Sequence, residues 1–126
     1  MKKIINTSNA PAPIGPYNQA ILSNGTLYIS GQIPLNPKNG ELVSGDIKKE
    51  TKQCMENLKA ILTEAEMTFE NVVKSSIFLS DMKQFTEVNE VYASYFNAET
   101  APARETVEVA NLPKFVNVEI SMIAIK

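Results

Sequence analysis

Arg104 is the side chain best suited to chemistry, because it is the only arginine among twelve basic residues. A guanidinium is a planar fork of N–H donors that binds a carboxylate through two parallel hydrogen bonds, which a lysine ammonium cannot copy. It follows Ala101-Pro102-Ala103, at the start of a predicted strand over 104–110. This pattern favours a site for a small carboxylate, with an ion pair to one of the twelve glutamates as the alternative.

Glu119 is the second candidate, since it interrupts an apolar run over 117–125 that predicts a strand. A carboxylate in such a strand indicates a salt bridge, an edge position or a functional site, and Arg104 could itself be its partner. Tyr17 and the segment Ser30-Gly31-Gln32 are either pocket residues or plain packing. Cys54 falls on an apolar helical stripe and is expected to be a buried small hydrophobe.

The residue types that are missing exclude several reaction classes. The chain has no histidine and one cysteine, so Ser-His-Asp and Cys-His mechanisms and the common zinc sites lack their groups. A net charge of −2 and a pI near 5.2 argue against nucleic acid as a partner. No segment is typical of a signal peptide or a membrane span, which predicts a cytoplasmic protein without a membrane partner.

The apolar periodicity predicts the elements that must position these residues. Asn24-Gly25 lies between two short apolar runs, 18–22 and 26–33, and indicates a β-hairpin. Apolar residues spaced by three and four after Asp46, and again over 85–96, predict two helices, and 72–80 reads as a buried strand between them. The resulting order, β-β-α-β-α-β-β with room for one further short strand, predicts a single α+β domain over 1–126, with both helices on one face of a mixed sheet.

The uncovered face of this sheet is expected to carry Arg104, Thr106 and Glu108 from one strand and Glu119, Ser121 and Ile123 from the next. A face that mixes polar and apolar residues in this way is typical of a subunit interface. The pattern therefore predicts a closed homo-oligomer.

Several segments together resemble the RidA/YjgF family of imine deaminases. They span nearly the whole chain and include Gly15-Pro16-Tyr17-Asn18-Gln19-Ala20, Ser30-Gly31-Gln32-Ile33-Pro34, Asn89-Glu90-Val91-Tyr92, Pro102-Ala103-Arg104, Val107 to Pro113 and Val118-Glu119-Ile120. The resemblance implies a chorismate-mutase-like fold and a homotrimer with pockets between neighbouring subunits. It also implies hydrolysis of 2-iminobutanoate and 2-iminopropanoate to 2-oxo acids and ammonia, without a cofactor or a metal.

The same resemblance assigns roles to individual positions. Arg104 would hold the substrate carboxylate, and Glu119 would orient or deprotonate the attacking water. The Gly31 backbone would approach the ligand, and the pocket would be lined by Tyr17, Ser30, Asn89 and Thr106. Thr106 stands where many members have cysteine, and Asn18 where serine is frequent.

Two other functions stay open at this level. The same pocket could bind 2-oxo acids or other small carboxylates as a sensor, without turnover. A role with nucleic acid, which some relatives have been credited with, would require an oligomer that gathers its lysines on one surface.

Overall fold

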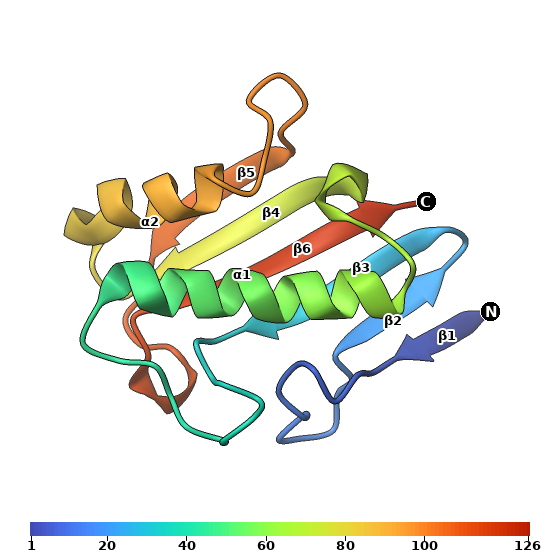
Figure 1. Ribbon diagram of the computed structural model, residues 1–126, viewed down its shortest axis with the longest axis horizontal. Helices are drawn as coiled ribbons and strands as arrows, with labels where there is room; N and C mark the ends of the chain where they lie inside the picture. Colours follow the sequence, from blue (N-terminus) through green and yellow to red (C-terminus); the bar gives the residue numbers. More distant parts are fainter.

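The computed structural model describes residues 1–126 and consists of one six-stranded sheet with two helices on one of its faces (Figure 1). The strand order is β1-β2-β3-β6-β4-β5; β4 and β5 run parallel, and every other pair is antiparallel. The elements are β1 (Lys2–Ile5), β2 (Ala20–Ser23), β3 (Thr26–Gln32), α1 (Ile47–Glu64), β4 (Val72–Leu79), α2 (Phe85–Ala93), β5 (Ala103–Glu108) and β6 (Val118–Ile125), with short 3₁₀ turns η1 (Phe69–Asn71), η2 (Met82–Gln84) and η3 (Pro113–Phe115). The predicted α+β class with a mixed sheet is confirmed.

The predicted hairpin is formed by β2 and β3. Asn24 and Gly25 take φ angles of 50° and 79°, the left-handed values that a tight turn demands and that Asn and Gly adopt most easily. The Asn-Gly pair therefore fixes the register that runs from Ala20 opposite Ile29 to Ser23 opposite Thr26.

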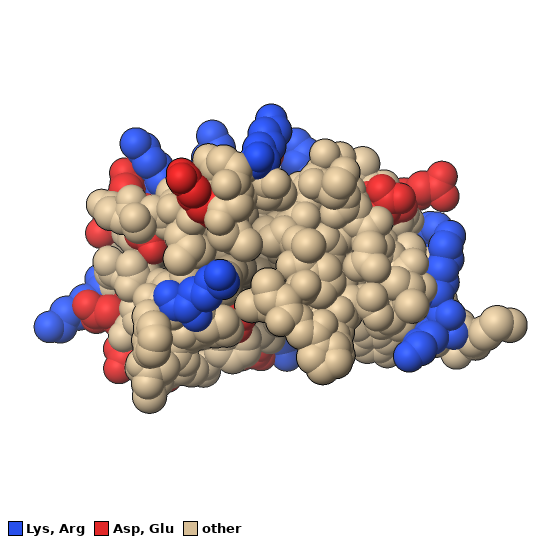
Figure 2. All heavy atoms as spheres, turned by 90° about the horizontal axis from the view of Figure 1, so that it is seen from below, with Lys and Arg blue, Asp and Glu red and all other residues tan.

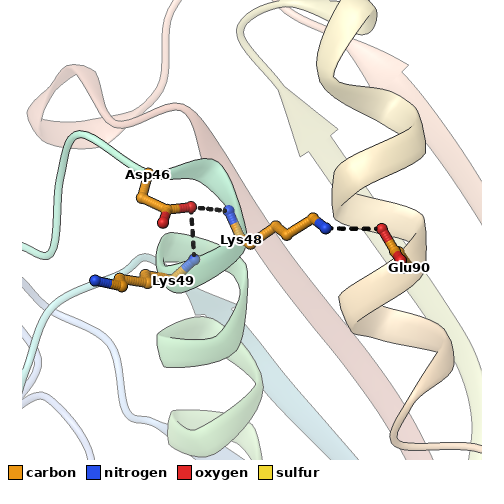
Figure 3. A network of polar contacts seen from close by, with 4 residues as sticks. All are labelled: Asp46, Lys48, Lys49 and Glu90. Atoms are coloured by element: carbon orange, nitrogen blue, oxygen red, sulfur yellow. Dashed lines mark hydrogen bonds and ion pairs between the residues drawn. The ribbon is translucent and has the colours of Figure 1, made fainter.

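Helix α1 starts where the sequence predicts. The Asp46 carboxylate accepts hydrogen bonds from the backbone N–H groups of Lys48 and Lys49, at 3.0 and 3.4 Å, which satisfies two donors of the first turn (Figure 3). The predicted stripe faces the sheet, and all of its members are buried: Ile47, Thr51, Cys54, Leu58, Ile61, Leu62 and Ala65. Burial of each large aliphatic side chain contributes about 1.5–3 kcal/mol, so this stripe holds the helix on the sheet.

Helix α2 is shorter than predicted and ends at Ala93, so Tyr95 and Phe96 lie in the following turns and pack edge-on against Phe69. It is attached to α1 by an ion pair between Lys48 Nζ and Glu90 Oε2, 2.9 Å apart (Figure 3). The pair is exposed at both ends and contributes little to stability. It nevertheless shows which face of α2 turns toward α1, because Glu90 on that face reaches Lys48.

Strand β1 is an additional element, which the sequence pattern leaves unassigned. Lys2 to Ile5 form an edge strand against β2, and only Ile5 is buried. Its two lysines fit an edge position, where charges discourage pairing with other chains.

The predicted distribution of residues between the two sheet faces is wrong for β5. Arg104 lies beside the buried Ser75 in the parallel ladder and contacts α2, so Arg104 and Thr106 face the helices. Glu108 also reaches this side, where its Oε1 accepts a hydrogen bond from the Met82 N–H at 2.7 Å. Glu119, Ser121 and Ile123 do face away from the helices, because they alternate with the buried Val118, Ile120, Met122 and Ala124.

Neither helix has the length and apolar character that crossing a membrane requires.

Candidate functional site

Arg104 is half-buried on β5, the edge strand next to β4, and lies beneath α2. Its Nη1 donates a hydrogen bond of 2.7 Å to Asn89 Oδ1. Its guanidinium carbon lies 5.0 Å from the Tyr92 ring centroid and 5.6 Å from that of Phe85, within cation–π range of both. These contacts fix the direction of the fork and leave donors free.

No carboxylate neutralises this guanidinium within the chain. The two ion pairs of the protein join Lys48 to Glu90 and Lys74 to Glu105, and neither includes Arg104. The alternative in which Arg104 pairs with Glu119 therefore does not hold within one chain. A half-buried cation with a neutral amide as its only hydrogen-bond partner is suited to binding an anion.

Thr106 lies two residues after Arg104 on the same face of β5. Its hydroxyl oxygen is buried and has no hydrogen-bond partner in the chain. Buried hydroxyl groups are nearly always paired, since an unpaired one costs about 1–3 kcal/mol. Together with Asn89, Tyr92 and Phe85, these two residues form what we call the Arg104 cluster.

Glu119 on β6 lies directly over the backbone of Gly31. A Cβ atom on residue 31 would be only 2.8 Å from the Glu119 carboxyl carbon and 2.9 Å from its Oε2, so only glycine leaves the space that this carboxylate occupies. Burial raises the pKa of Glu119 above its ordinary value of 4.5. A carboxylate with a raised pKa is a stronger base and matches the role expected for Glu119.

Tyr17 and Gly31 share a narrow cleft next to Glu119. The cleft has a volume of about 30 Å³, enough for a water molecule, and its wall also includes Ile14 and Lys114. The Tyr17 hydroxyl accepts a long hydrogen bond of 3.4 Å from the Ile14 N–H, so it keeps its own proton to donate. Ser30 is already engaged, since its hydroxyl donates to the Asn18 carbonyl at 2.6 Å. We call Glu119, Gly31, Tyr17 and Ser30 the Glu119 cluster.

Gln19 is a positioning residue that sequence reasoning did not single out. Its buried side-chain amide donates to the carbonyls of Thr7 and Pro11, each at 2.9 Å, and its Oε1 accepts from the Thr7 N–H at 2.7 Å. These bonds fasten the proline-rich arm, and with it Tyr17, to the start of β2. Nothing in the local pattern distinguishes this glutamine from an exposed one.

Phe85 and Tyr92, whose rings lie beside Arg104, belong to the apolar pattern over 85–96, and that pattern alone predicts only a helix. Phe85, Asn89 and Tyr92 are separated by four and three residues, so they share one face of α2 and meet Arg104 together. That spacing was a usable signal, because Asn89 interrupts an otherwise apolar stripe.

The structure therefore separates the predicted site residues into two clusters. The Arg104 cluster lies under α2 on the helical face, whereas Glu119 lies on the open face of the same sheet. A hollow of about 930 Å³ lies beside α1 and is lined by no residue of either cluster. No three acidic or thiol side chains converge anywhere in the chain as a metal site would require.

The comparisons with known proteins cover nearly all of this chain. The family model described as Endoribonuclease L-PSP matches residues 7–126. A RutC family protein of Pyrococcus horikoshii is 54% identical over 100% of this chain and 99% of its own length. The mouse (Mus musculus) 2-iminobutanoate/2-iminopropanoate deaminase is 47% identical, over 100% of this chain and 93% of that protein.

A solved structure, that of E. coli TdcF with bound serine, has a TM-score of 0.92 and is 39% identical, covering 98% of each chain. Identity at this level over the full length, with the same fold, indicates common descent rather than a shared architecture alone. The chain therefore belongs to the RidA/YjgF family, the one whose model carries the description Endoribonuclease L-PSP.

Proposed function

We propose that this protein hydrolyses small 2-imino acids, such as 2-iminobutanoate and 2-iminopropanoate, to 2-oxo acids and ammonia. The observation that carries the proposal is the uncompensated guanidinium of Arg104, held by Asn89 and two aromatic rings with donors left for a carboxylate. Every 2-imino acid has a carboxylate next to the carbon that water must attack, so an anchor for that group positions the reacting carbon.

The chemistry needs only an anchor, a base and water. The water oxygen bonds to C2 of the protonated imine while Glu119 accepts a proton from the water. The tetrahedral adduct then collapses. Glu119 returns the proton to the nitrogen, the C–N bond breaks as ammonia leaves, and the C=O bond forms as the hydroxyl proton of the adduct passes to Glu119, which releases it to the departing ammonia. A positioned carboxylate base contributes about 10²–10⁴-fold to such a step, and the raised pKa of Glu119 fits this task.

The two clusters would meet between copies of the chain. Arg104 and Glu119 face opposite sides of one sheet, so one small ligand reaches both only if they belong to different copies. The open face also carries Tyr28 and Ile123, which lie opposite each other in the ladder, with Tyr28 half-exposed. We infer a homotrimer in which each pocket takes its Arg104 cluster from one copy and its Glu119 cluster from the next.

Two of the relatives support the substrate class. The mouse relative is a 2-iminobutanoate/2-iminopropanoate deaminase, and the TdcF structure holds serine. Serine has the carboxylate and the C2 nitrogen that a 2-imino acid has, so it is the kind of molecule that the proposed pocket would accept.

A second function, binding of small 2-oxo acids without turnover, is supported by the same free guanidinium. Glu119 distinguishes the two functions, since binding a carboxylate requires Arg104 whereas hydrolysis requires both. Under the proposal, Glu119→Gln abolishes ammonia release and leaves the affinity for a 2-oxo acid nearly unchanged. Under the alternative, the wild-type protein shows no turnover at all.

The test is an imine-trapping assay. An amino-acid oxidase or threonine dehydratase generates the imine, and semicarbazide traps what has not been hydrolysed. Addition of the wild-type protein should lower the amount of trapped imine and raise the rate of ammonia release, and Glu119→Gln should do neither. Trapping that is unchanged by the wild-type protein would contradict the proposal and favour the binding function.

A further inference from the structure

The turn that precedes β6 contains two successive residues with left-handed backbone. Lys114 and Phe115 both have φ angles of 55°. For residues other than Gly, Asn and Asp this conformation is unfavourable, and a bulky aromatic residue adopts it rarely. The other two non-glycine residues of this kind have local reasons, since Asn24 lies in the hairpin turn and Glu66 follows the end of α1.

Packing within the chain does not compensate for this strain. Phe115 is 82% exposed, more than any other large hydrophobic residue except Met1. The turn is nevertheless firmly held, because Leu112 before it and Val116 after it are buried. The Phe115 N–H also donates to the Leu112 carbonyl at 2.8 Å. Phe115 is thus exposed while the backbone on both sides of it is held in place. Backbone strain that is kept in this way is characteristic of functional sites.

The position of the turn points to the proposed pocket. Lys114, the neighbour of Phe115, lines the cleft shared by Tyr17 and Gly31. Phe115 precedes Glu119 by four residues, and β6 begins between them. The side of the molecule that carries η3 and the proline-rich arm has few charges across its middle, as the view from below shows (Figure 2). The Phe115 ring adds exposed apolar surface to the turn whose Lys114 lines this cleft.

We propose that Phe115 is a specificity-determining residue that forms an apolar wall of the substrate pocket and favours 2-imino acids with side chains longer than methyl. This inference rests on the proposed function and names a substrate subclass for it. The expected preferred substrates have branched, thioether or aromatic side chains. Their contact with the ring removes apolar surface of both from water, whereas the methyl group of 2-iminopropanoate is too small to gain much.

Phe115→Gly is the informative variant, since glycine adopts the left-handed conformation freely and the fold should survive. The ratio of kcat/KM for the leucine-derived imine to that for the alanine-derived imine should fall about tenfold or more. The Tm should equal or exceed that of the wild type. Phe115→Leu keeps an apolar side chain and should keep most of the ratio. Ile4→Ala, on the edge strand β1, removes a half-exposed apolar group outside both clusters and should leave the ratio unchanged.

Binding of 2-oxo acids separates this inference from the proposed function. Calorimetry measures the affinities for pyruvate and for 4-methyl-2-oxopentanoate. Their ratio compares a methyl with a longer apolar side chain of the ligand, and it requires no turnover. A wild-type protein that hydrolyses no imine would contradict the proposed function, and the ratio of the two affinities would still test Phe115. The inference is overturned if Phe115→Gly changes both ligands or both substrates equally, or if it dissociates the oligomer, which would make the ring an assembly contact.

Discussion

Arg104 and Glu119 lie on opposite faces of one sheet and two strands apart. On the shared neighbour β4, Arg104 is level with Ser75 and Glu119 is level with Phe78. Three residues along a strand correspond to about 10 Å, and two strand spacings add a similar distance across the sheet. Arg104 and Glu119 of one chain therefore cannot contact the same small ligand.

Arg104→Lys should lower kcat/KM for 2-iminopropanoate by about tenfold or more. A lysine keeps the charge but loses the second parallel hydrogen bond and the stacked, planar geometry, and a charge-assisted bond is worth about 1.5–3 kcal/mol. Steady-state ammonia release measures the effect. Lys83→Arg, on the exposed turn before α2, is the matched control and should leave the rate unaffected. A fully active Arg104→Lys protein would remove Arg104 from the site.

Gly31→Ala should reduce turnover strongly. The new Cβ would be 2.8 Å from the Glu119 carboxyl carbon, so the carboxylate must turn away from its present position. Gly15→Ala is the control, since its Cβ would meet only the Tyr17 ring at an ordinary 3.6 Å. Stopped-flow or coupled assays of both variants check this. Equal activity of the two variants would show that the position of Glu119 has no part in the reaction.

The raised pKa of Glu119 predicts opposite effects on activity and stability. In its proposed role as base, Glu119 works only when it is ionised, so kcat/KM should fall as the pH drops through the raised pKa of Glu119. Because the folded state raises this pKa, Glu119 stabilises the fold most at pH values below its unfolded pKa. This contribution is lost as the pH rises through the folded value.

Glu119→Gln should therefore be inactive, yet as stable as the wild type or more so at pH 7. Thermal unfolding of both proteins at pH 4 and pH 7 measures this, and the difference in Tm should be larger at pH 7. A variant that is clearly less stable at pH 7 would show that the ionised carboxylate supports the fold instead.

Thr106→Val tests the buried hydroxyl next to Arg104. Valine has the same shape and removes an oxygen that has no partner in the chain, so the Tm should not fall. If the hydroxyl serves the ligand, kcat/KM should decrease severalfold, by about the value of one neutral hydrogen bond of 0.5–1.5 kcal/mol. If the variant has the kinetics of the wild type, the Thr106 hydroxyl does not contact the substrate. It then bonds a neighbouring copy of the chain or stays without a partner.

Much of the fold could be predicted because its signals are local. Asn24-Gly25 specifies a hairpin turn, and Asp46 together with the stripe of α1 specifies where that helix starts and what it buries. Strand β1 could not be predicted, because its four residues include only one buried residue and show no hydrophobic periodicity. The strand also depends on β2 for its backbone hydrogen bonds.

The residues of the candidate site stay a prediction, and the face of the sheet predicted for Arg104 and Thr106 was wrong. β5 is an edge strand of six residues with no fully buried residue. The alternation of its residues therefore gives no clear difference in hydrophobicity between the face toward the helices and the open face. Its orientation is set by the parallel pairing with β4 and by the bond from Arg104 to Asn89, both of which join distant parts of the chain. Such long-range contacts are not visible in a local pattern.

Mixing two variants that each impair one half of the proposed site tests the central claim most directly. Arg104→Lys and Glu119→Gln are unfolded and refolded together in equal amounts, and imine hydrolysis is compared with that of each variant refolded alone. If each pocket takes its anchor and its base from different copies, about a quarter of the pockets should be intact and a matching fraction of wild-type activity should return. Mixed oligomers that form but are no more active than the average of the two variants refolded alone would contradict the account.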